Sequence, residues 1–167
     1  MYLNQPDSIL SKLLLNLKAF KVEDKEGHIA KAPLLLWGMT LCGGDASNKA
    51  KVFWDVLQDG EQKFISANDK DFPESFSLLL DLSNRVMVEA DSIISGKPPK
   101  KSEDDLKKID DLKEAMGEEF LDTVYEAHSK LEKEEFLSRI VKNAKWILSA
   151  KTVRERVETA LKKSSQE

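Results

Sequence analysis

Two carboxylates stand two positions apart in the charged stretch VEDKEGHIAKAP, residues 22–33, and this spacing could serve a calcium ion. Alternate positions of a tight loop can aim Asp24 and Glu26 at one point, and calcium prefers oxygen ligands. A glycine follows where such a loop must turn sharply. A complete site also needs a bidentate Glu at the twelfth position, where the stretch has Pro33. We therefore expect Asp24 and Glu26 to be weak calcium ligands at most.

A second loop, residues 58–69, repeats the arrangement, because Ile65 follows Ile29 by 36 positions (65 − 29). An internal period of that size is typical of a repeated supersecondary unit. The second loop is poorer in ligands, since it has Lys63 where the sharp turn is needed and the shorter Asp69 in place of the bidentate Glu. We expect neither loop to bind calcium, and we expect no cofactor.

Helical periodicity dominates the elements around these loops, and Asp, Ser, Pro and Gly residues mark many of their boundaries. The predicted helices cover about residues 7–20, 33–42, 45–57, 73–95, 102–117, 118–127 and 133–162. The run GKPPKK, residues 96–101, is the clearest linker in the chain. We predict an all-α fold with paired helix–loop–helix units at 1–96, a linker at 97–102 and a C-terminal helical lobe at 103–167.

The second unit carries a resemblance to a known family. KAKVFWDVLQDGEQKFIS, residues 49–66, resembles the third-hand segment of calcineurin-B-like and neuronal-calcium-sensor EF-hand proteins, and GGDASNKA, residues 43–50, resembles their connector between hands. The resemblance covers roughly residues 7–95. It implies an EF-hand-like pair in which Ile29 and Ile65, at the eighth position of each loop, join their backbones in a short antiparallel bridge. Because the metal ligands depart from the family pattern, it implies a degenerate pair.

The segment SKLEKEEFL after the linker resembles the end of a further hand, with Leu131 at the eighth loop position and Glu135 at the twelfth. The first, third and fifth positions would then be Val124, Glu126 and His128. Val124 has no side-chain ligand, so Glu135 is a weak metal candidate. Leu131 has no evident partner loop at the usual spacing, and two ordinary helices joined by a tight turn are an equally supported alternative.

Composition excludes several functions. The net charge of −4 over 167 residues gives no argument for nucleic-acid binding, and no apolar run approaches the roughly 20 residues of a membrane span. The single cysteine, Cys42, fits a reducing compartment, and the first residues lack the order of a signal peptide. No phosphate-binding loop, nucleophile motif or catalytic triad order is present. We expect a cytoplasmic protein that is not an enzyme.

Large apolar side chains on the first pair of units are candidates for a partner groove: Trp37, Met39, Leu41, Phe53 and Trp54. If the units form an open lobe, these side chains could bury the apolar stripe of an amphipathic helix from a partner protein. If the lobe is closed, they form its core, which is the favoured alternative.

The C-terminal segment combines basic and apolar side chains in a predicted basic amphipathic helix, with Lys142, Lys145, Trp146, Lys151 and Arg154 as its marked residues. Such helices can bind acidic partners or anionic membranes. Its apolar stripe could instead close the second lobe while its charges face water, which is the alternative that we favour. The helix could also fold back into the groove of the first lobe, as the resemblance to sensor proteins permits.

These patterns favour a non-catalytic protein–protein interaction module, an adaptor or regulatory subunit, built on EF-hand-like units that have largely lost calcium binding. Without an ion to bias two states, such a module would be constitutive. Two alternatives remain: a calcium sensor with an unconventional loop, and a regulatory helical module that contacts an anionic membrane.

Overall fold

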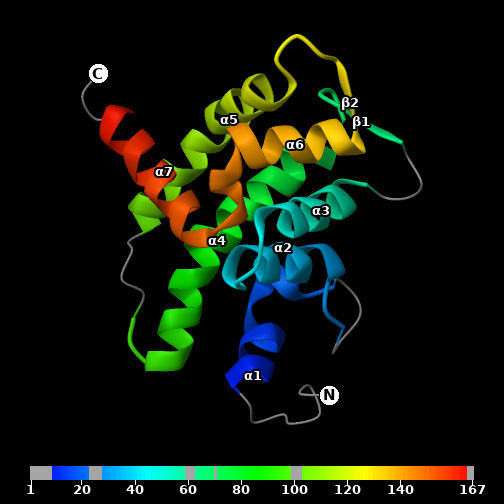
Figure 1. The fold of residues 1–167 in the computed structure, drawn as a ribbon. Helices are drawn as coiled ribbons and strands as arrows, with labels where there is room; N and C mark the ends of the chain where they lie inside the picture. Colours follow the sequence, from blue (N-terminus) through cyan, green and yellow to red (C-terminus); the bar gives the residue numbers. More distant parts are fainter. Residues whose placement is uncertain (1–8, 23–27, 59–62, 70, 99–102, 165–167) are drawn as a thin grey trace.

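Seven α-helices, two short 3-10 helices and one two-stranded sheet make up the part of the chain that the structure describes (Figure 1). This computed structural model describes residues 9–22, 28–58, 63–69, 71–98 and 103–164. The elements are α1 (Ile9–Asn16), η2 (Lys18–Phe20), α2 (Lys31–Leu41), α3 (Ala46–Leu57), β1 (Phe64–Ser66), α4 (Asp71–Ser95), α5 (Glu103–Tyr125), β2 (Lys130–Glu132), α6 (Lys133–Asn143), η3 (Lys145–Leu148) and α7 (Ala150–Ser164). The prediction of a mainly helical protein is confirmed.

Helix α3 begins and ends where the sequence predicts. The Asp45 carboxylate accepts hydrogen bonds from the backbone N–H groups of Ser47 and Asn48, at 2.9 and 3.1 Å. These bonds satisfy two of the donors that a helix start leaves unpaired. The spacing of Ala46, Ala50, Phe53, Trp54 and Leu57 predicts one apolar face, and all of these residues except the half-buried Ala46 are buried.

Helix α4 is long and ends at Gly96, as predicted. The glycine has φ of +64°, and its N–H donates to the carbonyl of Ser92 at 2.9 Å. A residue without Cβ adopts this left-handed conformation without strain, which is why glycine so often follows a helix.

Helix α5 is continuous from Glu103 to Tyr125, so the predicted break at Gly117 is wrong. A glycine inside a helix costs about 1 kcal/mol relative to alanine. Here the position lies against the ring of Phe76 on α4, because a Cβ on Gly117 would stand 3.6 Å from Phe76 Cδ1. Packing of α4 on α5 therefore outweighs the local preference for a break.

The predicted single helix over 133–162 is also wrong, since α6 ends at Asn143 and α7 begins at Ala150. Between them η3 turns Ile147 and Leu148 into the core, where both are buried. Ser149 then adopts an extended conformation, and its carbonyl accepts from the N–H of Val153 at 3.0 Å, which starts α7. The free energy gained by burying these two large aliphatic side chains exceeds the cost of interrupting the helical hydrogen bonds.

The sheet corrects the predicted loop pairing. Strands β1 and β2 run antiparallel, with Ile65 opposite Leu131, Phe64 opposite Glu132 and Ser66 opposite Lys130. Both central residues are 1% exposed. Ile29 instead forms an isolated bridge with Lys21, close by in the chain.

Two expectations about these loops are therefore wrong: Ile65 does not pair with Ile29, and Leu131 does have a partner. The reason is helix packing, because α3 packs on α6 and α4 packs on α5, which brings the two loops together across the predicted linker.

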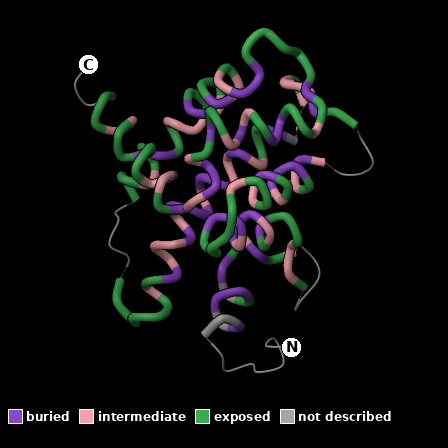
Figure 2. The backbone as a smooth tube through the Cα atoms, in the orientation of Figure 1, coloured by how far each residue is buried: buried purple, intermediate pink, exposed green. Residues whose placement is uncertain are grey.

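Buried apolar residues before and after the predicted linker belong to a single cluster. Figure 2 shows where the buried positions lie along the backbone. The centre of the cluster is aromatic: Phe72 lies 5.3 Å from Phe120, and Phe53 lies 6.2 Å from Phe136, between ring centroids. The predicted domain boundaries stay a prediction beside this shared core. No helix in the described part of the chain is long and apolar enough to cross a membrane.

Candidate functional site

Four of the five predicted groove residues are buried: Trp37, Met39, Phe53 and Trp54. The ring of Trp37 lies 5.1 Å from that of Phe20, and the ring of Trp54 lies 5.3 Å from that of Phe136. Leu41 is exposed at the end of α2. In this conformation the helices close over most of the predicted set, and its use by a partner stays a prediction.

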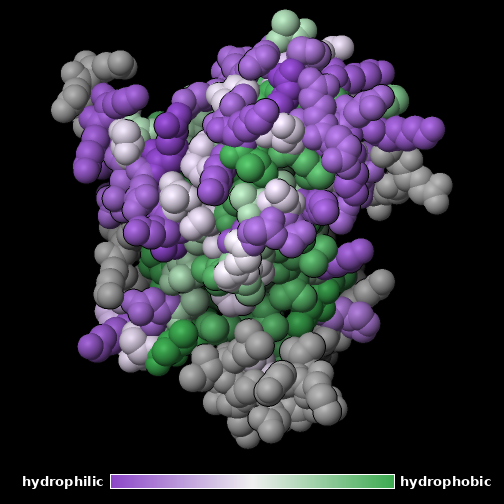
Figure 3. All heavy atoms as spheres, viewed as in Figure 1, coloured by the Kyte–Doolittle hydropathy of each residue, from purple (hydrophilic) through white to green (hydrophobic). Residues whose placement is uncertain are grey.

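A shallow hollow of about 420 Å³ opens beside this core between α2 and α3. Its apolar lining includes Leu34, Leu35, Met39 and Val52, and the chain from Cys42 to Asp45 forms one edge. Leu34 is 38% exposed. Apolar side chains gather over the lower half of the view in Figure 3, where Figure 1 places α2 and the lower part of α4.

A second hollow of about 610 Å³ adjoins the first, because both include Gly44, Asp45 and Lys49. Lys145 and Trp146 line it, together with the start of α7. The ammonium group of Lys49 is already engaged there, since Nζ donates to the carbonyl of Leu148 at 3.0 Å. This bond ties α3 to the turn between α6 and α7.

The residues of the predicted basic helix are distributed over three elements. Lys142 lies exposed on α6, and Lys145 and Trp146 belong to η3. Lys151 and Arg154 belong to α7, where Lys151 Nζ lies 3.8 Å from Glu155 and Arg154 Nη1 donates to the carbonyl of Ser83 at 3.1 Å. Three apolar residues of α7, Ala150, Val153 and Val157, are buried, whereas Ala160 and Leu161 are half-buried.

Four charged side chains connect α4 to α5. Arg85 Nη2 and Lys113 Nζ each lie 2.8 Å from an oxygen of Asp110, and Lys113 Nζ also lies 2.8 Å from Asp81. The hydrogen bond from Lys113 is the main reason that the pKa of Asp110 lies below its ordinary value, and Arg85 acts in the same direction against the effect of burial.

The turn from α5 to α6 gathers charged and polar groups around one guanidinium, that of Arg139. Its Nη2 and Nε donate to Glu135 Oε1 at 2.7 and 3.1 Å. Its Nη1 donates to the carbonyls of Val124 and Tyr125, at 2.9 and 3.2 Å, and lies 3.3 Å from Glu126 Oε2. The last carbonyl groups of α5 have no hydrogen-bond partners within the helix, and Arg139 places a positive charge next to them.

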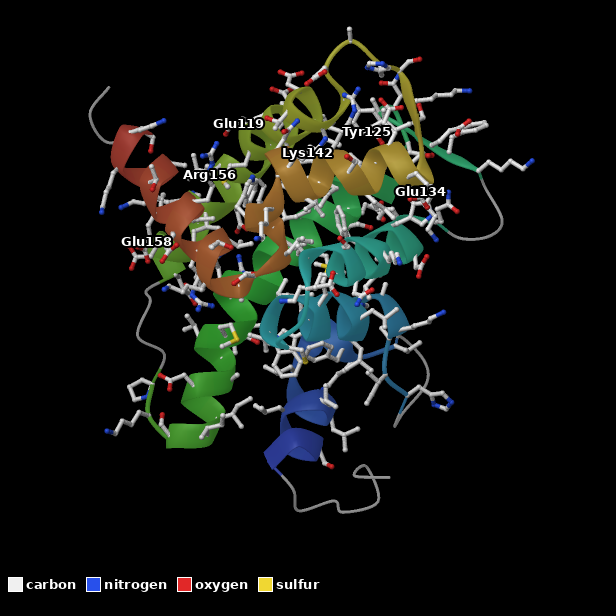
Figure 4. The ribbon with its side chains drawn as sticks, viewed as in Figure 1. Glu119, Tyr125, Glu134, Lys142, Arg156 and Glu158 are labelled. Atoms are coloured by element: carbon white, nitrogen blue, oxygen red, sulfur yellow. The ribbon has the colours of Figure 1, made fainter. Side chains whose placement is uncertain are left out.

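Two neighbours complete this turn. His128 Nδ1 lies 3.2 Å from Arg139 Nη2, and it can accept that bond when the imidazole proton is on Nε2. Tyr125, labelled in Figure 4 at the end of α5, is buried, and its hydroxyl has no hydrogen-bond partner among the described residues. Burial raises the pKa of Tyr125, and the negative charge of Asp69 adds to that effect.

The weak metal candidates have different outcomes. Asp24 and Glu26 lie outside the described residues. Glu135 is engaged by Arg139, four positions later on the same helix face. Among the described residues, no three His, Cys, Asp or Glu side chains are grouped as a metal site requires.

The sequence places Arg139 in the basic C-terminal segment, but its role in the turn between α5 and α6 was not predicted. The spacing of Glu135 and Arg139 could have indicated their pairing, but nothing local indicates the carbonyl groups of α5.

Comparison of the chain with family models, with curated proteins and with solved structures gives no match. The geometry of the helices, the two loops and the surface hollows is therefore the basis for a functional proposal.

Proposed function

We propose that this chain is a non-catalytic protein–protein interaction module, an adaptor or regulatory subunit, built on a degenerate EF-hand-like pair. One observation carries the proposal: Ile65 and Leu131, the eighth residues of two candidate loops, pair in a short antiparallel sheet. Each strand lies between two helices, in the orders α3–β1–α4 and α5–β2–α6. Two helix–loop–helix units joined at these positions are the arrangement that the EF-hand resemblance implies, although with a different partner for Ile65.

The loops support a module without a calcium switch. The loop of residues 58–69 lacks three features of a strong calcium site. Gln58 takes the place of an acidic ligand, Lys63 that of a glycine and Asp69 that of the bidentate Glu. In the loop of residues 124–135, the bidentate position is Glu135, which forms an ion pair with Arg139. A unit held by its own side chains has no ion to bias it between two states.

The hollow between α2 and α3 is the best-supported contact surface for a protein partner. Leu34, Leu35 and Val52 give it an apolar lining, and Asp45 and Lys49 place charges of both signs at its edge. An amphipathic helix would bury its apolar stripe there, and charged residues beside the stripe would give specificity.

Calcium calorimetry and cross-strand NMR contacts test the proposal together. We expect no heat of calcium binding and nuclear Overhauser contacts between Ile65 and Leu131. A heat of calcium binding together with a higher melting temperature in calcium would favour the calcium-sensor alternative. Absence of the cross-strand contacts would remove the basis for the pair.

Partner contact is tested by comparing two surface variants in affinity purification. Leu34→Glu places a charge in the hollow, whereas Ile94→Glu changes an exposed side chain at the end of α4. We expect a partner that is retained by the wild type and by Ile94→Glu but lost by Leu34→Glu. Equal retention by both variants would contradict the use of this hollow.

A further inference from the structure

We propose that the guanidinium of Arg139 takes the place of a metal ion in the loop between α5 and α6, as a permanent internal cation. This inference rests on the proposed EF-hand-like pair and concerns one of its two loops. It explains why two glutamates of this turn converge on one guanidinium.

The identity of the groups around the guanidinium carries the inference. When the loop is numbered from Val124 to Glu135, Arg139 contacts the backbone carbonyls at positions one and two, the carboxylate of Glu126 at position three, the imidazole of His128 at position five and the carboxylate at position twelve. A calcium loop supplies its ligands from positions 1, 3, 5, 7, 9 and 12. The side chains at positions three, five and twelve thus meet the guanidinium as they would meet an ion, and position one contributes its backbone carbonyl because Val124 has no side-chain ligand.

The charge and shape of arginine suit this position. Glu126 and Glu135 present two negative charges, and the carbonyls of Val124 and Tyr125 add partial negative charge at the end of α5. A guanidinium has five donors in a fixed plane, and all three of its nitrogens are used here. The Arg139 side chain is only 15% exposed, whereas both carboxylates are about half exposed or more, at 45% and 59%.

The backbone of the turn agrees with a loop that is held by the cation. Glu126 has φ of +52°, a left-handed conformation that is unfavourable for a residue with a Cβ. Its own carboxylate binds Arg139, which ties this residue to α6. The bound arginine thus fixes the geometry between α5 and β2.

The decisive experiment removes the internal cation and offers an external one. Arg139→Ala leaves two carboxylates and two carbonyls facing an open space. We expect a melting temperature about 5 °C or more below that of the wild type, because charged hydrogen bonds are lost. We expect calcium at about 1 mM, a concentration for weak protein sites, to raise it by about 3 °C.

The matched control is Arg156→Ala. Arg156 on α7 pairs with Glu119 on α5, away from the loop (Figure 4). The wild type and this control should not respond to calcium, and terbium luminescence sensitised by Tyr125 should appear only in Arg139→Ala. The same calcium shift in all three proteins overturns the inference. Destabilisation of Arg139→Ala with no calcium response also overturns it, since Arg139 would then be an ordinary ion-pair partner.

A variant that does not fold in buffer is refolded in calcium and followed by circular dichroism. Recovery of the helical signal supports the inference, and no recovery overturns it. The wild-type titration separates the two proposals. A calcium response of the wild type contradicts the proposed function, whereas an unresponsive wild type beside an unresponsive Arg139→Ala contradicts the Arg139 inference alone.

Discussion

Single residues in this protein show which polar groups have partners and which have none. Arg139 uses every nitrogen of its guanidinium, and one of the groups that it binds is the carbonyl of Tyr125. The Tyr125 hydroxyl, in contrast, is buried and has no partner among the described residues. A buried hydroxyl without a hydrogen bond lowers stability by roughly 1–3 kcal/mol. The hydrogen bonds of Arg139 therefore stabilise this turn, whereas the buried hydroxyl of Tyr125 destabilises it.

Tyr125→Phe removes the unpartnered hydroxyl and keeps the ring in the core. We expect a free energy of unfolding equal to that of the wild type or higher by up to about 1 kcal/mol, because the desolvation cost disappears. Urea unfolding followed by circular dichroism measures it. A loss of about 1 kcal/mol or more would mean that the hydroxyl has a partner, such as an ordered water.

Asp110 gives a prediction about pH. Its pKa in the folded protein lies below the ordinary value of 3.8, mainly through Lys113, so folding favours the charged carboxylate. The resulting stability is present above that ordinary value and is lost as pH falls through the lower folded pKa. Because the side chain is 43% exposed, the effect should stay below about 1 kcal/mol.

The measurement is urea unfolding of the wild type and Asp110→Asn from neutral pH to about pH 3. We expect the difference in unfolding free energy between the two proteins to shrink toward acid pH. Asp111→Asn is the control, since Asp111 is exposed on the same helix. A difference that stays constant with pH would contradict the role of the Asp110 charge.

At the scale of the elements, helix ends followed local chemistry and helix interruptions followed packing. The Asp45 cap and the Gly96 end were predictable because each depends on residues within one turn. The continuity of α5 at Gly117 depends on Phe76, and the turn after α6 depends on burial of Ile147 and Leu148. These causes involve residues far away in the sequence, outside the short segment from which a helix is predicted.

Two glycine substitutions separate local preference from packing. Gly117→Ala should stabilise the protein by about 0.5–1 kcal/mol, because alanine favours helix and its Cβ meets the Phe76 ring at an ordinary 3.6 Å. Gly96→Ala should destabilise it by about 1 kcal/mol, because φ is +64° there. Thermal unfolding compares the two variants with the wild type. A loss of stability in Gly117→Ala would show that the α4–α5 contact has no room for a methyl group.

At the scale of the molecule, the arrangement of the two loops was beyond the reach of sequence periodicity. Ile29 and Ile65 share a period, but a period records likeness between segments and not contact between them. The contact that forms joins Ile65 to Leu131 through the packing of α3 on α6 and α4 on α5. Glu135 and Arg139 lie four positions apart on α6, so their contact could be predicted from the sequence, whereas the contact of Glu126 with Arg139 depends on the path of the turn after α5.

A double-mutant cycle distinguishes the observed pairing from the predicted one. Ile65→Ala and Leu131→Ala should each cost about 2–5 kcal/mol, because both side chains are 1% exposed. Together they should cost at least about 0.5 kcal/mol less than the sum, since each loses the same contact. Ile65→Ala combined with Ile29→Ala should be additive, because Ile29 pairs with Lys21. Urea unfolding of the six proteins measures both cycles. Coupling of Ile65 to Ile29 but not to Leu131 would contradict the observed pairing of Ile65 with Leu131 and support the predicted pairing of the first two loops.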